Sequence, residues 1–537
     1  MNKIVHSFKV NNSNSLLAFN IILLFLIVTY ATLSIFNDTL RLLSYDEVDY
    51  ITASIQSLSG RWLSTNTLSI IDFIKLGYAK IGGSLPLDIS LIPEDQDNFL
   101  LRHYHGVIPT YYLTIFTSLN ELFSNNLIDN ARIYSTVIFF WIFCLLIIYF
   151  INKSSSLYSN YKYPLLLAIF FLSPGVIESF STFNFHIFLG ILIIPYCYYI
   201  SDLLHKYNIS SVFIVGFIMG LMILTLETSL VIIFSTIVYF CLFKRSALNM
   251  RLFLWLLVGC ATSLIIFNPG FLISCDILKA VFMYAYRIIV KSNAEYGSDT
   301  VNNQVVNSIL QFLPIFLLLI VSLIPFGLEL FKKKTIEDFS CITHEAFIGV
   351  IYLIFILRFT LSAYYMFPAM LLLFLGSVQN INHYKLFSSY LWKTSIVFSV
   401  FILIPLVIYN STRIGSSVNS YIAQSKKFSD ELSLPALKCN LESVESKNIL
   451  FLSDASNRLN LYSKKNCFKN FILDYDKQTF LIRINRKYVK LTEVLREYDI
   501  LLFAISNYRE YHQQLIDQNT SISLMDRNFY FSYYKLE

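Results

Sequence analysis

Apolar runs long enough to cross a membrane recur along this chain from Ser15 to Tyr409. A helix needs roughly 20 residues to cross a hydrocarbon core of about 30 Å. Hydrophobic residues make up 55% of the chain and charged residues 14%, and the mean hydropathy is +0.58. A water-soluble globular protein does not have this composition. The sequence therefore predicts a polytopic α-helical membrane protein.

We expect about 11 transmembrane helices in a membrane domain, residues 1–409. The first run is too long for a signal-peptide core and lacks a small-residue cleavage site after it, so we interpret it as a retained anchor. The predicted spans are 16–36, 131–151, 162–179, 185–203, 210–226, 228–243, 252–269, 306–330, 345–358, 362–378 and 391–409.

The basic residues predict the topology, because Lys and Arg are enriched in short cytoplasmic loops. With the N-terminus inside, the even-numbered spans all end at basic residues on the cytoplasmic side. These residues are Lys153, Lys206, Lys244, Arg245, Arg251, Lys332 to Lys334, and Lys385. The first outer loop, 37–130, and everything after residue 409 are then extracytoplasmic. We expect a multi-pass protein of a bacterial inner membrane.

The segment 107–123 allows two interpretations. As a further span it would invert every later loop and turn the basic loops outward, against the charge rule. We prefer an amphipathic helix in the membrane interface, with Tyr111, Tyr112 and Phe116 at headgroup level.

The composition becomes mixed and polar in residues 410–537, which predicts a small soluble α/β domain. "NILFLSD" and "YDILLFAIS" are typical of short buried strands, "KLTEVLREY" of a helix, and "SISLMDRNFYFSYYKLE" of a terminal hairpin. Cys439 and Cys467 fall in this segment, on the oxidising side of the membrane. A disulfide between them is one interpretation and two free thiols are the other, and the sequence leaves both open. The cysteines within spans, Cys144, Cys197, Cys241 and Cys260, are interpreted as small apolar fillers.

Three carboxylates follow the first span closely, in "RLLSYDEVDYITAS" at Asp46, Glu47 and Asp49. One interpretation is a solvated face, or an amphipathic helix in the membrane interface whose carboxylates stay in contact with water. The other is a functional site, because a long outer loop follows and ends in "RHYHGVIPTYY" and "DNARIYSTVIFFWIFCLLIIYF".

This arrangement resembles the membrane glycosyltransferases of the C fold, above all the lipid A aminoarabinose transferases and the protein O-mannosyltransferases. In that family an Asp-Glu pair followed by Tyr lies in the first outer loop, and Asp46, Glu47 and Tyr50 occupy those places here. "GFIMGLMILTLETSLVII" and "LRFTLSAYYMFPAMLLLFLG" are similar to further family segments. The single Pro109 and Glu227 depart from the family pattern, which has a Pro pair and often a Lys at these places.

The resemblance implies transfer of a sugar from a polyprenyl-phosphate donor to an acceptor hydroxyl on the outer face. Such a hydroxyl needs a carboxylate to accept its proton, and we assign that role to Asp46. Glu47 either orients the acceptor or binds a divalent metal cation through its hard oxygens. No other cofactor is expected.

Arg358 is the cationic candidate, because it is the basic residue that falls in a short outer turn. Burial of a guanidinium at that depth is costly without a partner. A snorkelling or stabilising Arg is one interpretation, and bidentate recognition of the donor phosphate is the other.

Further polar residues gather on the predicted outer side and are candidates for acceptor binding or for support of the site. They are His105, Glu178, His186 and Glu227. Lone polar residues at helix ends are often merely interfacial, so both readings stay open. His103 and His105 are only weak evidence for a metal site.

We therefore expect a glycosyltransferase of the inverting type, a hexosyl- or pentosyltransferase that acts on a surface glycan such as lipopolysaccharide, on a lipid or on a protein. Its partners would be the polyprenyl-phosphate sugar, the acceptor and membrane lipids, and no nucleic acid. A polymerase of polysaccharide repeat units, or a flippase or transporter of lipid-linked sugars, is the alternative. A transporter would favour charged or broken helices that face a central cavity, often with internal repeats, and we find neither in the sequence.

Overall fold

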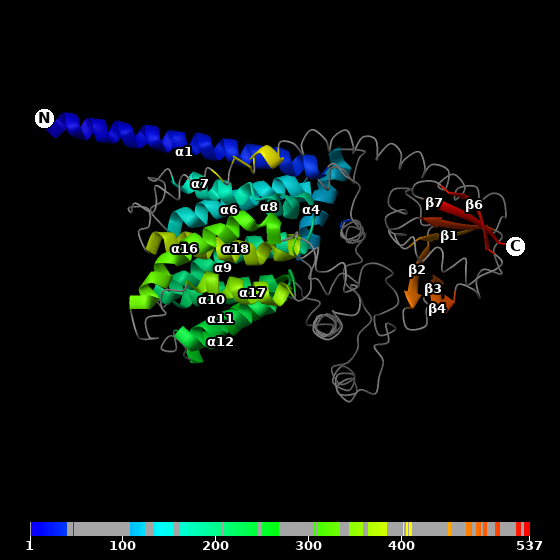
Figure 1. Ribbon diagram of the computed structural model, residues 1–537. Coiled ribbons are helices and arrows are strands. Elements are labelled where there is room, and N and C mark those ends of the chain that lie inside the picture. Colours follow the sequence, from blue (N-terminus) through cyan, green and yellow to red (C-terminus); the bar gives the residue numbers. More distant parts are fainter. Residues whose placement is uncertain are drawn as a thin grey trace. The chain divides into compact units, whose positions relative to one another are not determined.

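The computed structural model describes the helices of the membrane region and the strands of the C-terminal region (Figure 1). The described residues form two compact units, one with the helices and one with the strands and Glu47. They are residues 2–39, 47, 108–123, 134–154, 162–205, 208–226, 228–243, 250–267, 306, 309–332, 343–357, 363–383, 401, 404–405, 407–410, 449–453, 469–474, 479–484, 487–490, 500–504, 522–527 and 531–536.

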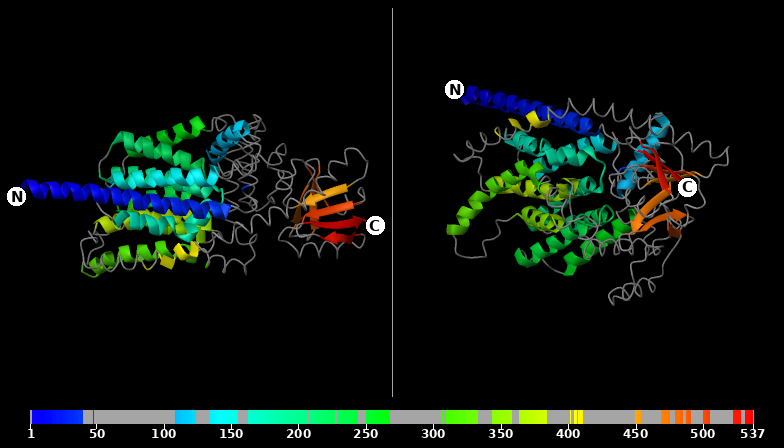
Figure 2. Two further views of the ribbon diagram at one scale, coloured as in Figure 1. Left: turned by 90° about the horizontal axis from the view of Figure 1, so that it is seen from above. Right: turned by 45° about the vertical axis from the view of Figure 1, so that its right-hand side comes forward.

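The helices of the first unit run side by side in both views of Figure 2, and α4, in light blue, lies at one end of them. Their bounds are α1 Asn2–Thr39, α4 Ile108–Phe123, the π-helix η3 Tyr134–Ile138, α6 Phe139–Ser154, α7 Lys162–Phe171, α8 Pro174–Ser181, α9 Phe185–His205, α10 Ile209–Ile223, α11 Ser229–Phe243, α12 Met250–Phe267, α16 Leu313–Lys332, α17 His344–Leu357 and α18 Ala363–His383.

The predicted spans from 16–36 to 362–378 each overlap described helices, whereas the last, 391–409, lies largely outside the described residues. By length and composition, four of the described helices can cross a membrane, and α7 with α8 adds a fifth if the bent pair is one span. The described helices also contain five shorter apolar segments of 10–17 residues, among them Leu313–Leu323 of α16. The protein is thus a multi-pass membrane protein.

The predicted span 162–179 is broken into two helices, which differs from the continuous helix that we expected. Helices α7 and α8 meet at an angle of 59°. Pro174 opens α8, and Ser173 before it has φ −60° and ψ 128°. A proline disfavours the helical region for the residue before it, so "LSPG" ends one helix and starts the next.

Helix α18 is the central helix of the bundle. Of its stretch Tyr364–Ile381, 83% is buried, against 17% for Met250–Phe267 of α12. It packs against α8, α9, α16 and α17, as Figure 1 also shows. The exposed faces of α1 and α12 carry residues such as Ile22, Phe25 and Leu254. An apolar outward face of this kind suits contact with lipid.

Glycines allow α10 and α12 to approach closely. A Cβ added at Gly216 would lie 2.2 Å from the Leu256 carbonyl oxygen, and one added at Gly259 would lie 2.3 Å from the Phe213 carbonyl oxygen. Small residues at helix contacts let backbones meet in this way within membranes. The pair therefore packs backbone to backbone along this seam.

Helix α4 lies across the ends of other helices, which agrees with the helical prediction for 107–123. The Ile108 amide donates to the Leu224 carbonyl at 3.2 Å, and the Tyr111 hydroxyl donates to the Phe267 carbonyl at 2.9 Å. These carbonyls belong to the C-terminal ends of α10 and α12, where helices leave acceptors unsatisfied. Burial raises the pKa of Tyr111, so its hydroxyl stays protonated and remains a donor.

The second unit contains a seven-stranded sheet in the order β4-β3-β2-β1-β5-β7-β6. Strand β1 is parallel to β2 and β5, and the other pairs are antiparallel. The bounds are β1 Ile449–Ser453, β2 Lys469–Asp474, β3 Thr479–Ile484, β4 Lys487–Lys490, β5 Ile500–Ala504, β6 Ile522–Arg527 and β7 Phe531–Leu536.

Strands β1 and β5 and the terminal β6–β7 hairpin confirm the strands that the sequence predicts, whereas β2, β3 and β4 were not predicted. The predicted helix "KLTEVLREY" begins at Lys490, which instead ends β4, and its remaining residues lie outside the described ones. Cys439 and Cys467 also lie outside the described residues.

Candidate functional site

The turn between α8 and α9 is built on one buried amide, Asn184, which is 2% exposed. Its Oδ1 accepts from the Ile187 amide at 3.1 Å, and its Nδ2 donates to the Ser179 and Thr182 carbonyls at 2.9 and 2.8 Å. An Asn at this position caps the free N–H groups of a helix start. Asn184 thus fixes both the end of α8 and the first turn of α9.

His186 lies in that first turn and is 5% exposed. Its ring centroid is 4.4 Å from that of Tyr365 and 5.8 Å from that of Tyr364, both in the first turn of α18. The two tyrosine rings are stacked at 4.6 Å. The imidazole is therefore held between α9 and a pair of phenols.

Glu178 lies in the last turn of α8 and is half-buried. The Gln311 side-chain amide donates to its Oε2 at 2.6 Å. Gln311 belongs to the helical turn before α16, so this contact joins α8 to α16 at the same end of the bundle. A hydrogen bond to the charged form of a carboxylate favours that form.

Aromatic residues pack beneath these polar groups. The ring centroid of Phe180 lies 5.2 Å from that of Phe367 and 5.1 Å from that of Phe143. A Cβ added at Gly190 would lie 2.4 Å from the Phe367 ring, so the glycine admits this ring between α9 and α18. The layer keeps the polar groups at the end of the helices.

We call Glu178, His186, Gln311, Tyr364 and Tyr365 the α8–α9 cluster. It combines a carboxylate, an imidazole, an amide and two phenols at the junction of four helices. A phenol O–H or an imidazole N–H can donate a hydrogen bond to a phosphate oxygen. A carboxylate can accept a proton or bind a sugar hydroxyl. Because these groups can both donate and accept hydrogen bonds, the cluster suits a polar ligand.

The structure brings Glu178 and His186 to the same helix junction. Glu47 belongs to the second unit and is buried. The other predicted site residues lie outside the described residues and stay predictions; these are Asp46, Tyr50, His105, Glu227 and Arg358.

Sequence reasoning missed Gln311, Tyr364, Tyr365 and Asn184 as members of this region. Gln311 is a polar residue inside the predicted span 306–330, which is a detectable signal. The tyrosines stand in the quoted "LSAYYMFP" segment, but their contact with His186 depends on how α9 and α18 pack.

Among the described His, Cys, Asp and Glu residues, one group has ligand atoms close enough together to hold a metal ion. It consists of Cys197, His344 and Glu345 and does not belong to the α8–α9 cluster. The predicted role of Glu47 as a metal ligand therefore stays a prediction.

The fold of this chain is similar to that of solved ArnT structures, in line with the sequence resemblance to the glycosyltransferases of the C fold. The structure of ArnT from Cupriavidus metallidurans bound to undecaprenyl phosphate matches with a TM-score of 0.57 and 11% identity, over 96% of this chain and 98% of that one. The apo state of the same protein matches with a TM-score of 0.56, 11% identity and the same coverage.

The archaeal oligosaccharyltransferase AglB from Archaeoglobus fulgidus, in complex with an inhibitory peptide and a dolichol-phosphate, has a TM-score of 0.42 and 12% identity over 75% of this chain and 61% of that one. That score is too low to argue a shared fold. No protein-family model and no curated protein matches the sequence.

Removal of the Asn184 cap should destabilise the helix junction. Asn184→Ala leaves two carbonyls and one amide without their partner, so we expect a loss of about 1–2 kcal/mol or more in the free energy of unfolding. The control is Asn208→Ala, since Asn208 caps α10 through one bond to the Ser210 amide at an exposed position. Thermal unfolding in detergent measures both. Equal losses in the two variants would contradict the central role of Asn184.

Proposed function

We propose that this protein transfers a sugar from a polyprenyl-phosphate-linked donor to an acceptor hydroxyl on a surface glycan, lipid or protein at the outer face of the membrane. The observation that carries the proposal is the fold shared with ArnT along nearly the whole chain. That neighbour was solved with undecaprenyl phosphate, and a polyprenyl phosphate is the product that such a transfer would release.

Asp46 is the proposed general base. It follows the end of α1 by seven residues, in the place that the acidic pair occupies in the resembling family. A sugar hydroxyl is a poor nucleophile at neutral pH, so a carboxylate within hydrogen-bond reach has to accept its proton during attack. Burial of the adjacent Glu47 supports a role in orienting the acceptor or in binding a cation, since a buried carboxylate needs compensating partners.

Arg358 is the proposed partner of the donor phosphate. It stands between Leu357, the last residue of α17, and Ala363, the first of α18. The tyrosines that contact His186 follow Ala363 directly. This proximity along the chain supports a common site for Arg358 and the α8–α9 cluster, in which a guanidinium fork and phenol hydroxyls would hold phosphate oxygens.

The proposed reaction is a single displacement. The acceptor oxygen forms a bond to the anomeric carbon as the bond from that carbon to the phosphate oxygen breaks. The hydroxyl proton passes to Asp46, and the electron pair of the broken bond leaves on the polyprenyl phosphate, whose charge Arg358 stabilises. One displacement from the opposite face inverts the anomeric configuration.

The proposed orientation rests on the basic loops. It puts the N-terminus in the cytoplasm of a bacterial inner membrane, and the first outer loop and the segment 410–537 outside. Eleven spans and an extracytoplasmic α/β domain are part of this proposal. The α8–α9 junction then lies at the outer side, as a lipid-linked donor requires.

Substitution of the acidic residues separates a catalytic site from a solvated face. Asp46→Asn keeps the shape but cannot accept the proton, so turnover should fall by roughly 10² to 10⁴. Glu47→Gln should have an intermediate effect, and Asp49→Asn serves as the nearly silent control. The measurement is sugar transfer by purified variants at matched concentrations. Full activity in Asp46→Asn would refute its role as the base.

Replacement of Arg358 by Lys tests bidentate phosphate binding. Arg358→Lys keeps the charge but loses the planar fork. A hydrogen bond to a charged group contributes about 1.5–3 kcal/mol, so transfer should fall by about 10- to 100-fold. Arg251→Lys, at an exposed position in α12, should retain activity. Equal activity of the two variants would reduce Arg358 to an interfacial anchor.

A further inference from the structure

A second group of buried polar side chains lies where α9 and α17 meet. Cys197 of α9 is 3% exposed, and His344 and Glu345, the first residues of α17, are 2% and 0% exposed. One ligand atom from each lies within 4.8 Å of the other two. We call these three residues the α9–α17 cluster.

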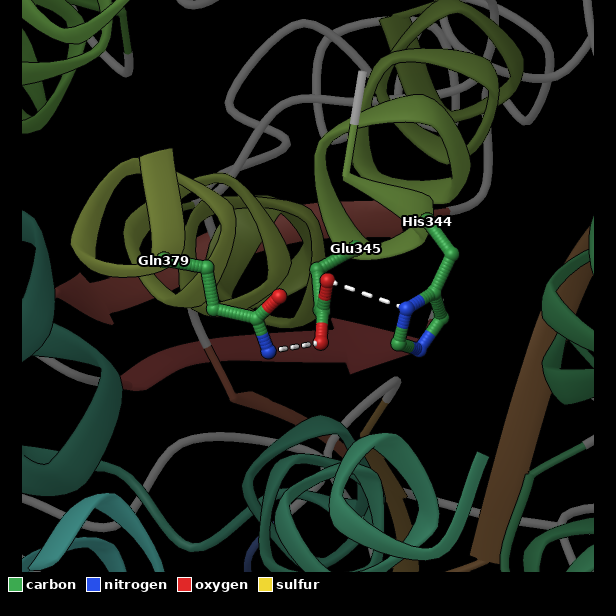
Figure 3. Close-up of polar contacts among 3 residues, drawn as sticks. All are labelled: His344, Glu345 and Gln379. Carbon is green, nitrogen blue, oxygen red and sulfur yellow. Dashed lines mark hydrogen bonds and ion pairs between the residues drawn. The ribbon is translucent and has the colours of Figure 1, made fainter. Parts of the chain in front are cut away.

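Figure 3 shows how two of these side chains are arranged with Gln379 of α18. His344 Nδ1 lies 3.1 Å from Glu345 Oε2. The Gln379 side-chain amide donates to the other carboxylate oxygen, Oε1. The Glu345 carboxylate is therefore held between an imidazole and an amide that come from two helices.

Hydrogen bonds within the described part of the chain leave this cluster incomplete. There, His344 Nε2 is buried without a hydrogen-bond partner, and Glu345 Oε2 has only its ion-pair contact with His344 Nδ1. A buried polar atom without a partner costs about 1–3 kcal/mol. A purely structural contact between α17 and α18 would explain the hydrogen bond from Gln379 to Glu345 Oε1. It explains neither the position of the Cys197 thiol nor the unpartnered His344 Nε2.

We propose that the α9–α17 cluster binds a divalent transition-metal ion of the zinc class. Thiolate sulfur, imidazole nitrogen and carboxylate oxygen are the three ligand types that zinc takes in proteins. A thiolate and a carboxylate together balance the two positive charges of the ion, with the imidazole neutral. A neutral site is the arrangement that a buried, low-dielectric position tolerates best.

The spacing of the side chains is compatible with such a site. Metal–ligand distances of about 2.0–2.3 Å hold tetrahedral ligand atoms about 3.3–3.7 Å apart, so the three atoms need to close by only about 1 Å. Gln379 has the position of a residue that orients a ligating carboxylate through its free oxygen. The ion would join α9 to α17 directly, and α18 through Gln379.

This cluster is separate from the α8–α9 cluster, although both use α9 and α18. Cys197 follows His186 by eleven residues along α9, which is about 16 Å at 1.5 Å per residue. Gln379 follows Tyr365 by fourteen residues along α18, or about 21 Å. The proposed ion therefore has a structural role at the other end of the bundle.

Metal analysis of the purified full-length protein tests the proposal. After removal of loosely bound metal with a weak chelator and reloading with zinc, the wild type should retain a single zinc ion per chain. Cys197→Ser and His344→Ala should lose it. Cys144→Ser is the matched control, because Cys144 is a thiol in α6 that is equally buried, at 2% exposed, and it should keep the ion. Equal zinc content in Cys197→Ser and Cys144→Ser would overturn the proposal.

Two further measurements remain decisive if a ligand variant fails to fold. Gln379→Leu keeps all three ligands and should lower zinc affinity by about 10- to 100-fold. Wild-type protein loaded with Co²⁺ instead of zinc should show a thiolate-to-metal absorption band, which a site without Cys197 cannot produce. Folded wild-type protein that neither retains zinc nor shows this band would refute the site.

Discussion

Helix α18 runs through the middle of the bundle and packs against α8, α9, α16 and α17. Glycines on both sides of it make the close contacts possible: Gly190 of α9 admits the Phe367 ring, and a Cβ at Gly349 of α17 would lie 3.0 Å from Leu372. Between membrane helices close van der Waals packing replaces the hydrophobic driving force. Because α18 carries Tyr365 near one end and Gln379 near the other, its position sets the geometry of both polar clusters.

The ends of the helices hold most of the polar chemistry of the bundle. Within a hydrocarbon core the backbone groups have to be satisfied inside each helix, so free carbonyl and amide groups appear only at helix ends and breaks. Asn184 accepts a hydrogen bond from a free amide at the start of α9, and α4 donates hydrogen bonds to the carbonyls of Leu224 and Phe267. The same ends bring Glu178 and His186 to one helix junction.

Helix positions could be predicted from the sequence because the length and apolarity of each run are local properties. The break before Pro174 also had a local signal in the residues Ser173 to Gly175. We expected a continuous helix there because the apolar run is long enough for one span. The polar clusters were harder to predict. Cys197, His344 and Gln379 are far apart along the chain and meet only through helix packing, so the sequence alone led us to interpret Cys197 as an apolar filler. The roles that we propose for Asp46 and Arg358 come from a family resemblance and from charge placement.

The donor that we propose is a sugar linked to a polyprenyl phosphate. The most direct test offers purified wild-type protein in lipid vesicles the same set of sugars in two forms, linked to a polyprenyl phosphate or to a nucleotide, with cell-envelope extract as acceptor. We expect transfer to an envelope component from one or more lipid-linked sugars and none from the nucleotide-linked forms. Transfer from the nucleotide-linked sugars alone, or from no member of the set, would contradict it.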